Sequence, residues 1–165
     1  MGRSHTTMTS PLGRLTLVAE DGVLCGLYME QQRMPDPMTF GPRDDAAFEE
    51  VVRQLAGYFA GERTEFSVPV RPPGGSFRRR VWDELTRIPY GATRTYSQIA
   101  EPFGPGHEML RKVAAAVGAN PIAVIVPCHR VIGADGSLIG YAGGLERKRR
   151  LLELEGAGVA PARLF

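Results

Sequence analysis

The residues with the clearest potential for chemistry are Cys128 and His129, which follow one another directly. A thiolate is a strong nucleophile, and a nearby imidazole is a base that can generate it from a thiol. The apolar, mostly β-branched stretch at residues 120–126 predicts a buried strand that ends at Pro127, with the pair at its mouth. A cysteine taken alone is more often an inert, small apolar side chain than a catalyst. The sequence around the pair therefore has to decide between the two interpretations.

The composition is that of an ordinary globular protein. Of its 165 residues, 43% are apolar and 23% charged, and the chain has neither an apolar run long enough to span a bilayer nor an opening signal peptide. The only other cysteine, Cys25, lies in an apolar run and is interpreted as a packing residue, so neither a disulfide framework nor a zinc spacing is expected. A thiol that must stay free fits a reducing compartment, which predicts a cytoplasmic protein.

The net charge of +2 argues only weakly for a nucleic-acid partner. Basic residues are clustered in the second half, at residues 78–80 and 147–150. Each cluster taken alone is interpreted as a solvated helix face rather than a phosphate clamp.

The first half predicts a small sheet-plus-helix unit without visible chemistry, and residues 1–8 are assigned to no element. The Pro- and Gly-rich residues 71–75 predict a domain junction. The expected elements are strands at residues 15–18, 23–29 and 65–70, a loop at 31–43, and a helix that Asp44 or Asp45 caps and Gly61 ends.

The second half predicts helices. One helix is expected from about Phe77 to a stop at Pro89, and a capping box at Thr95 starts a second, which reaches about Phe103. After the break at residues 104–106, another helix is expected, and the last runs over residues 145–155. The third helix is expected to bury Leu110, Val113, Ala114 and Val117 and to leave Arg111, Lys112, Ala115 and Ala116 nearer the exposed side. Its pairing with the second helix indicates a helix-turn-helix, although a plain helical hairpin fits the pattern equally well.

The segment 127–131, Pro-Cys-His-Arg-Val, occurs with Asn120-Pro121 upstream and Tyr-Ala-Gly-Gly-Leu at residues 141–145 downstream. Together these motifs resemble the active-site signature of the O6-alkylguanine-DNA alkyltransferases, also called methylated-DNA–protein-cysteine methyltransferases. The resemblance extends over about residues 10–155 and is strongest from Phe77 onward. It implies an α/β (α+β) fold with two domains. Residues 1–75 would form a small, ribonuclease H-like α/β domain with a linker, and residues 76–165 a mainly helical domain with the helix-turn-helix and the active site.

The resemblance also implies roles for the residues around the cysteine. Cys128 would take the alkyl group, and a water would link its thiol to His129, which Glu155 orients and polarises. Asn120 would brace the active-site turn. Without the family spacing, Glu155 would be interpreted as an exposed acid at a helix end.

For DNA, the resemblance implies that Arg111 enters the base stack where a nucleotide has flipped out, and that Tyr96 helps to turn that nucleotide. The other implied DNA-binding residues are Thr95, Lys112, Ala115 and Ala116, and the implied base-pocket residues are Val131 (through its carbonyl), Tyr141, Ala142 and Lys148. The third helix departs from the family pattern: it reads Leu-Arg-Lys-Val-Ala at residues 110–114 where Ala-Arg-Ala-Val-Gly is usual, and the preceding turn is about one residue longer. These differences bear on groove fit and lesion preference.

The resemblance thus implies a monomeric DNA-repair protein that acts on double-stranded DNA and uses neither a metal nor a cofactor. It would transfer alkyl groups from O6 of guanine, and from O4 of thymine, irreversibly to Cys128. Two other classes stay open: a non-catalytic helix-turn-helix DNA-binding module, and a thiol hydrolase. The intact Cys-His pair and Glu155 argue against the first, and the lack of an oxyanion-hole motif argues against the second.

Overall fold

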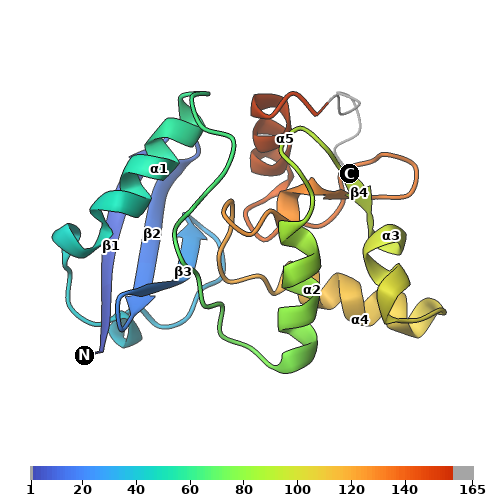
Figure 1. Cartoon of the computed structure of the whole chain (residues 1–165), viewed down its shortest axis with the longest axis horizontal. Coiled ribbons are helices and arrows are strands. Elements are labelled where there is room, and N and C mark those ends of the chain that lie inside the picture. The colour runs from blue at the N-terminus through green and yellow to red at the C-terminus, as the bar shows by residue number, and fades with distance from the viewer. Residues whose placement is uncertain (1, 158–165) are drawn as a thin grey trace. The chain divides into compact units, whose positions relative to one another are not determined.

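The computed structural model describes residues 2–157 and divides into two compact units (Figure 1). The first unit comprises residues 2–73 together with Pro121–Ile125, and the second comprises residues 74–120 and 126–157. The sequence did not predict that five residues just before the Cys-His pair belong to the first unit. Residues 158–165, the end of the predicted second domain, lie outside the described residues.

The first unit is built on an antiparallel sheet of order β1-β2-β3. The predicted hairpin is confirmed by β2 (Gly13–Glu20) and β3 (Val23–Met29), which join through a turn with Gly22 at φ +80°. The sequence missed β1 (Arg3–Ser10), which pairs with β2 along its full length. This edge strand is rich in Ser and Thr and carries one fully buried side chain, Thr6, so it lacks the apolar pattern that marks a strand.

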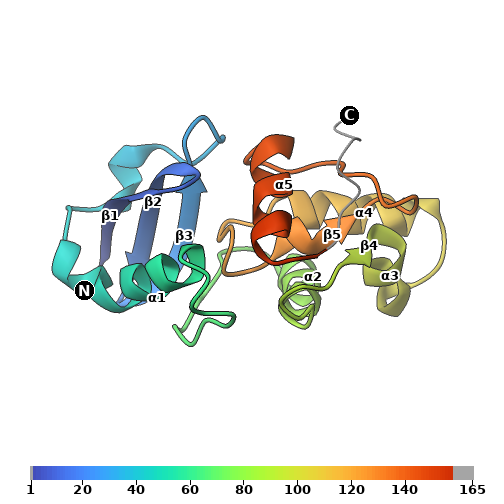
Figure 2. The ribbon, with the colours of Figure 1, turned by 90° about the horizontal axis from the view of Figure 1, so that it is seen from above.

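One helix lies along one face of this sheet, as Figures 1 and 2 both show. The short 3-10 helix η1 (Pro37–Phe40) lies in the predicted loop. A second 3-10 turn, η2 (Asp45–Phe48), then leads into α1 (Glu49–Phe59). The predicted cap is confirmed, because the Asp44 side chain accepts a hydrogen bond from the backbone N–H of Ala47. The helix buries Val51, Leu55 and Tyr58.

Two predicted strands are wrong. Residues 65–70 form only an isolated bridge between Val70 and Leu24. Residues 120–126 are almost fully buried, as expected, but they form a single bridge, from Ile122 to Leu27 of β3. Val124 adopts φ +71°, which breaks the extended backbone, and the proline nitrogens at positions 121 and 127 cannot donate to a ladder.

The second unit is mainly helical. Its helices are α2 (Ser76–Thr86), α3 (Tyr96–Ala100), which continues as the 3-10 turn η3 (Glu101–Phe103), α4 (His107–Gly118) and α5 (Leu145–Leu154). These confirm the four predicted helices. The sequence missed a short parallel pair of strands, β4 (Arg94–Thr95) with β5 (Val131–Ile132).

The core of this unit joins α2 to α4 and α3 to α4. Trp82 is buried on α2 and donates from its indole nitrogen to the Ala116 carbonyl, at 2.8 Å. Because a buried indole N–H needs an acceptor, this bond fixes where α4 crosses α2. Among the described residues, no helix combines the length and the hydropathy that crossing a bilayer requires.

Candidate active site

A single tight turn carries three chemically active side chains. Cys128, His129 and Arg130 form the 3-10 turn η4 (Cys128–Arg130), which begins directly after Pro127 and leads into β5. The backbone N–H of Cys128 donates to the Val126 carbonyl at 2.8 Å. All three side chains are buried, where α2 and α5 pack against the turn. A 3-10 turn projects three successive side chains in different directions, so each can meet a different neighbour.

The Cys128 thiol is held in a largely desolvated place. Burial raises the pKa of the thiol above its usual value, while a hydrogen bond from the Asn120 side chain and the positive charge of Lys148 act in the opposite direction. Asn120 is itself buried, and its amide donates to the Val126 carbonyl at 2.8 Å. Asn120 therefore holds both the backbone before the cysteine and the thiol. Because burial dominates, the resting group is a thiol, and a base is needed to ionise it.

His129 and Glu155 lie together in the interior. The imidazole Nε2 is 2.7 Å from Glu155 Oε2, and both side chains are fully buried. A carboxylate can only accept, so Nε2 carries the proton and Nδ1 has the free lone pair. Glu155 is the C-cap residue of α5, so the end of this helix places the carboxylate beside the turn. The alternative of an exposed acid at a helix end is therefore wrong.

The other ring nitrogen of His129, Nδ1, is buried and makes no hydrogen bond to any residue that the structure describes. Burial lowers the pKa of the imidazole, although the hydrogen bond and charge of Glu155 act to raise it. The ring is consequently neutral at neutral pH. A neutral, oriented imidazole with a free lone pair is able to accept a proton from a thiol.

Arg130 is a site residue that the sequence analysis did not single out. Its Nε donates to Glu155 Oε1 at 2.8 Å and its Nη2 donates to Oε2 at 3.0 Å, while Nη1 donates to the Ile88 carbonyl at 2.6 Å. The guanidinium thereby neutralises a fully buried carboxylate and fixes its plane. The signal available in the sequence was an arginine inside an otherwise buried segment, which needs an acidic partner.

Three of the predicted base-pocket residues lie near the turn in sequence or in space. Val131 is fully buried in β5, where it pairs with Arg94. The Tyr141 hydroxyl is buried and has no hydrogen-bond partner among the described residues, and burial raises its pKa well above the usual value. The fully buried Lys148 exerts a charge on Cys128. Ala142 is exposed.

The predicted capping box at the start of α3 is confirmed. The Thr95 hydroxyl accepts from the N–H of Gln98, and the Gln98 side chain accepts from the N–H of Thr95. Tyr96, the first residue of the helix, is half-buried. Thr95 also belongs to β4, whose partner β5 follows the Cys-His turn directly. The start of α3 is thus tied to the backbone of the site.

Helix α4 presents part of the surface that was predicted for it. Arg111, Lys112 and Ala115 are exposed, but Ala116 is not: its exposed fraction is 2%. The expectation that Ala116 lies nearer the exposed side is therefore wrong, because the residue packs beneath Trp82 and gives that side chain its acceptor.

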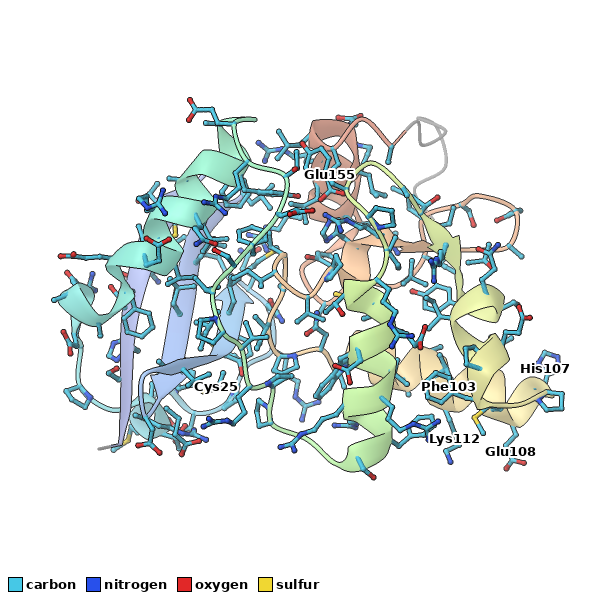
Figure 3. All side chains as sticks on the ribbon, in the orientation of Figure 1. Cys25, Phe103, His107, Glu108, Lys112 and Glu155 are labelled. Atoms are coloured by element: carbon cyan, nitrogen blue, oxygen red, sulfur yellow. The ribbon has the colours of Figure 1, made fainter. Side chains whose placement is uncertain are left out.

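The exposed Lys112 side chain contacts a pair of aromatic rings. Its Nζ lies 4.8 Å above the Phe77 ring, and Arg80 lies 4.9 Å above the Phe103 ring. The two rings meet edge to face at 5.5 Å. Figure 3 shows Phe103 and Lys112 in the same part of this unit, beyond which His107 and Glu108 mark the start of α4.

Cys25 belongs to a different unit from Cys128. It belongs to the first unit, in which Figure 3 labels it, and it packs there with Val18, Tyr28 and Phe40. Burial raises the pKa of its thiol as well. Its neighbours in this cluster are apolar or aromatic, which fits the packing interpretation.

The comparisons with known proteins identify the class to which this protein belongs. The family model described as "6-O-methylguanine DNA methyltransferase, DNA binding domain" matches residues 76–157, and that described as the "ribonuclease-like domain" of the same protein matches residues 4–72. The chain therefore belongs to the 6-O-methylguanine DNA methyltransferase family.

Individual relatives agree. The methylated-DNA–protein-cysteine methyltransferase of Mycobacterium tuberculosis strain H37Rv is 51% identical over 92% of this chain and 91% of its own length. The inducible enzyme of that name from Bacillus subtilis is 47% identical over 90% and 82%. The crystal structure of the M. tuberculosis O6-methylguanine methyltransferase matches with a TM-score of 0.85 and 49% identity over 98% of this chain and 97% of that one. The M. tuberculosis protein OGT in complex with DNA also gives a TM-score of 0.85, at 50% identity over 98% and 96%.

Proposed function

We propose that this protein repairs DNA by transferring an alkyl group from O6 of guanine to the sulfur of its own Cys128. Membership of the family makes it a DNA-repair methyltransferase that acts on DNA and uses a cysteine of the protein as acceptor. The observation that carries the residue assignment is the contrast between two buried thiols. Cys128 adjoins the buried His129–Glu155 pair, and Cys25 does not.

In the reaction we propose, the Cys128 sulfur forms a bond to the alkyl carbon while the bond from that carbon to O6 breaks. The electron pair of the broken bond passes to guanine. His129 Nδ1 receives the thiol proton through a water, and that proton is finally taken up by the departing guanine, which leaves neutral. General acid–base help of this kind contributes roughly 10²–10⁴ in rate. The product is a thioether, a poor leaving group, so each molecule acts once.

The supporting residues keep this arrangement in place. Asn120 hydrogen-bonds the thiol and the Val126 carbonyl, which braces the turn. Glu155 fixes the tautomer of His129. Such outer partners orient a base and set its basicity. We further propose that Val131, Tyr141, Ala142 and Lys148 surround the base.

For DNA, we propose that α3 and α4 act as a helix-turn-helix and that the target nucleotide flips out of the stack. Arg111 is exposed on α4 and has a planar guanidinium, which can stack on bases and hydrogen-bond to the base left unpaired. Tyr96, Thr95, Lys112 and Ala115 complete this surface, whereas the buried Ala116 contributes its small size to the packing under α4.

We also propose that O4 of thymine is a second target. The two domains would comprise residues 1–75 and 76–165. The protein would be a monomer and would be located in the cytoplasm.

The test is intact mass after incubation with a duplex that carries O6-methylguanine. We expect a mass gain of one methyl group per molecule, located on Cys128 in a tryptic digest. Cys128→Ala should bind the duplex and gain nothing, and Cys25→Ala should react like the wild type. A label on Cys25, or transfer by Cys128→Ala, would overturn the assignment. Binding without any transfer would favour a DNA-binding module, and repeated turnover would favour a hydrolase.

A further inference from the structure

Two donors from distant parts of the second unit converge on the same pair of carbonyls. The ammonium of Lys148 donates to the carbonyls of Ile139 and Gly140, at 2.8 and 3.1 Å. The hydroxyl of Tyr96 donates to the Ile139 carbonyl at 3.0 Å and lies 3.5 Å from that of Gly140. The same ammonium lies 5.8 Å above the Tyr96 ring. The four residues therefore form one closed cluster of α3, α5 and the segment just before Tyr141.

We propose that Tyr96 and Lys148 are positioning residues that clasp Ile139 and Gly140, and thereby hold residues 141–144 in the shape of the base pocket before any DNA is bound. This inference rests on the proposed function, because it assigns a role at the same site. This positioning role of Tyr96 differs from the DNA-binding role proposed above, because the clasp consists only of protein groups and needs no DNA.

The backbone at the clasp explains why side chains are needed there. Both Ile139 and Gly140 are exposed, and Gly140 adopts φ +63°. A Cβ at position 140 would lie 3.3 Å from the Tyr96 hydroxyl, so the absence of a side chain allows the tyrosine to approach this closely. Neither residue belongs to a strand or a helix, so no ladder of backbone hydrogen bonds fixes the position of Ile139 or Gly140. The clasp supplies that restraint from outside.

Burial of the charged Lys148 side chain costs free energy, so we expect the residue to have a function at this position. The side chain is fully buried, and no carboxylate among the described residues pairs with it. Burial lowers its pKa to about 8 and raises that of Tyr96 to about 12. Two carbonyl dipoles and an aromatic face are thus the groups that compensate the ammonium. An apolar residue would pack there with less penalty, but it could not hold the segment.

The cluster also connects the DNA-binding candidate to the chemistry. Tyr96 is the first residue of α3, immediately after the capping residue Thr95. On the other side, the charge of Lys148 acts on the Cys128 thiol and favours its ionised form. The clasp therefore connects the start of α3 to the segment that leads into Tyr141.

The test is single-turnover alkyl transfer from the free base O6-methylguanine, because no DNA is present to occupy Tyr96. Tyr96→Phe removes one hydroxyl and no charge, and Lys148→Met removes the ammonium. We expect each to slow the reaction by roughly threefold to tenfold, the effect of losing one or two hydrogen bonds. The double variant should lose less than the product of the two, because both act on the same carbonyls. Arg150→Met on α5 and Tyr28→Phe in the first unit are matched controls and should react like the wild type.

Hydrogen exchange of the amides of residues 141–144, measured without DNA, gives a second readout. Both variants should exchange faster there than the wild type, and the two controls should not. If Tyr96→Phe reacts with the free base at the wild-type rate and is slow only on duplex DNA, the tyrosine acts on DNA and the clasp is rejected. Unchanged exchange would reject it as well. Failure of the proposed function is separate, since the wild type itself would then place no alkyl group on Cys128.

Discussion

Arg130 and Glu155 form a buried ion pair in which two guanidinium nitrogens bond the two carboxylate oxygens, at 2.8 and 3.0 Å. The carboxylate is fully buried, and the arginine side chain is 9% exposed. A carboxylate in this environment would be strongly unfavourable without its partner. The ion pair therefore allows Glu155 to remain charged in the interior of the protein, where it accepts a hydrogen bond from His129.

Arg130→Met should destabilise the protein by about 3–5 kcal/mol, because it leaves the Glu155 charge buried and unpaired. Urea unfolding measures this loss. Arg149→Met is the control: Arg149 pairs with Glu146 and Glu153 on the surface of α5, where such pairs contribute little to stability. Equal losses for both variants would show that the buried pair has no special weight.

Glu155→Gln should slow alkyl transfer far more than it weakens DNA binding. It removes the negative charge that orients and polarises His129, whose free lone pair is on Nδ1, and the expected slowing is roughly 10²–10⁴-fold. Single-turnover kinetics at saturating protein measure it, after circular dichroism has shown that the variant is folded. Glu153→Gln, which changes an exposed acid on the same helix, should keep the wild-type rate constant. A similar rate constant for both variants would remove Glu155 from the mechanism.

The rate of transfer should fall at acid pH. Burial lowers the pKa of His129 below the ordinary 6.5, so the imidazole is neutral and able to accept the proton down to lower pH. In Glu155→Gln the acid limb should lie lower still, because the carboxylate is what raises this pKa. Rates with the free base, measured as a function of pH, test the order of the two limbs. A wild-type limb above pH 6.5 would contradict it.

Stability should follow the same titration. The folded protein binds the His129 proton less readily than the unfolded chain does, so protonation favours unfolding. The stability contributed by the neutral imidazole is fully present above pH 6.5 and is lost as the pH falls through the lowered pKa. Urea midpoints between neutral and acid pH should show this loss. His129→Gln should lose less of its stability over that interval, and an equal loss would assign it to other groups.

Arg111→Ala should be selectively slow on a paired lesion. If Arg111 fills the gap of a flipped base, its loss matters where unpairing costs a few kcal/mol and matters little for a free base or a bulge. Lys112→Ala should mainly weaken DNA binding, with a shallower salt dependence. Its contact with Phe77 adds a second expectation, a small loss of stability of about 0.5–1 kcal/mol. The decisive measurement is the ratio of paired to free-base rates, and equal ratios for both variants would reduce Arg111 to a surface charge.

Local sequence signals were sufficient for much of the second unit. The capping box at Thr95 is satisfied within one turn of the chain, and the apolar periodicity of α2, α4 and α5 is visible in the sequence itself, so these helices formed where predicted. The hairpin of β2 and β3 has the same origin, since its turn and its apolar runs are adjacent in sequence. The Cys-His motif likewise marked the turn that we propose carries the chemistry.

Other features depend on partners that are distant in the sequence, and only the tertiary structure decided them. The apolar run at residues 120–126 looks like a strand, yet Val124 turns the backbone and Leu27 supplies a single bridge, because burial alone does not distinguish a strand from an irregular buried segment. Ala116 is buried because α2 packs against α4, where the Trp82 indole bonds the Ala116 carbonyl. The roles of Arg130 and Lys148 depend on acceptors 25 and 8–9 residues away, and no sequence spacing states which buried cation meets which oxygen. The residue types fixed which chemistry was possible, and the packing of α5 against the turn decided which side chains share it.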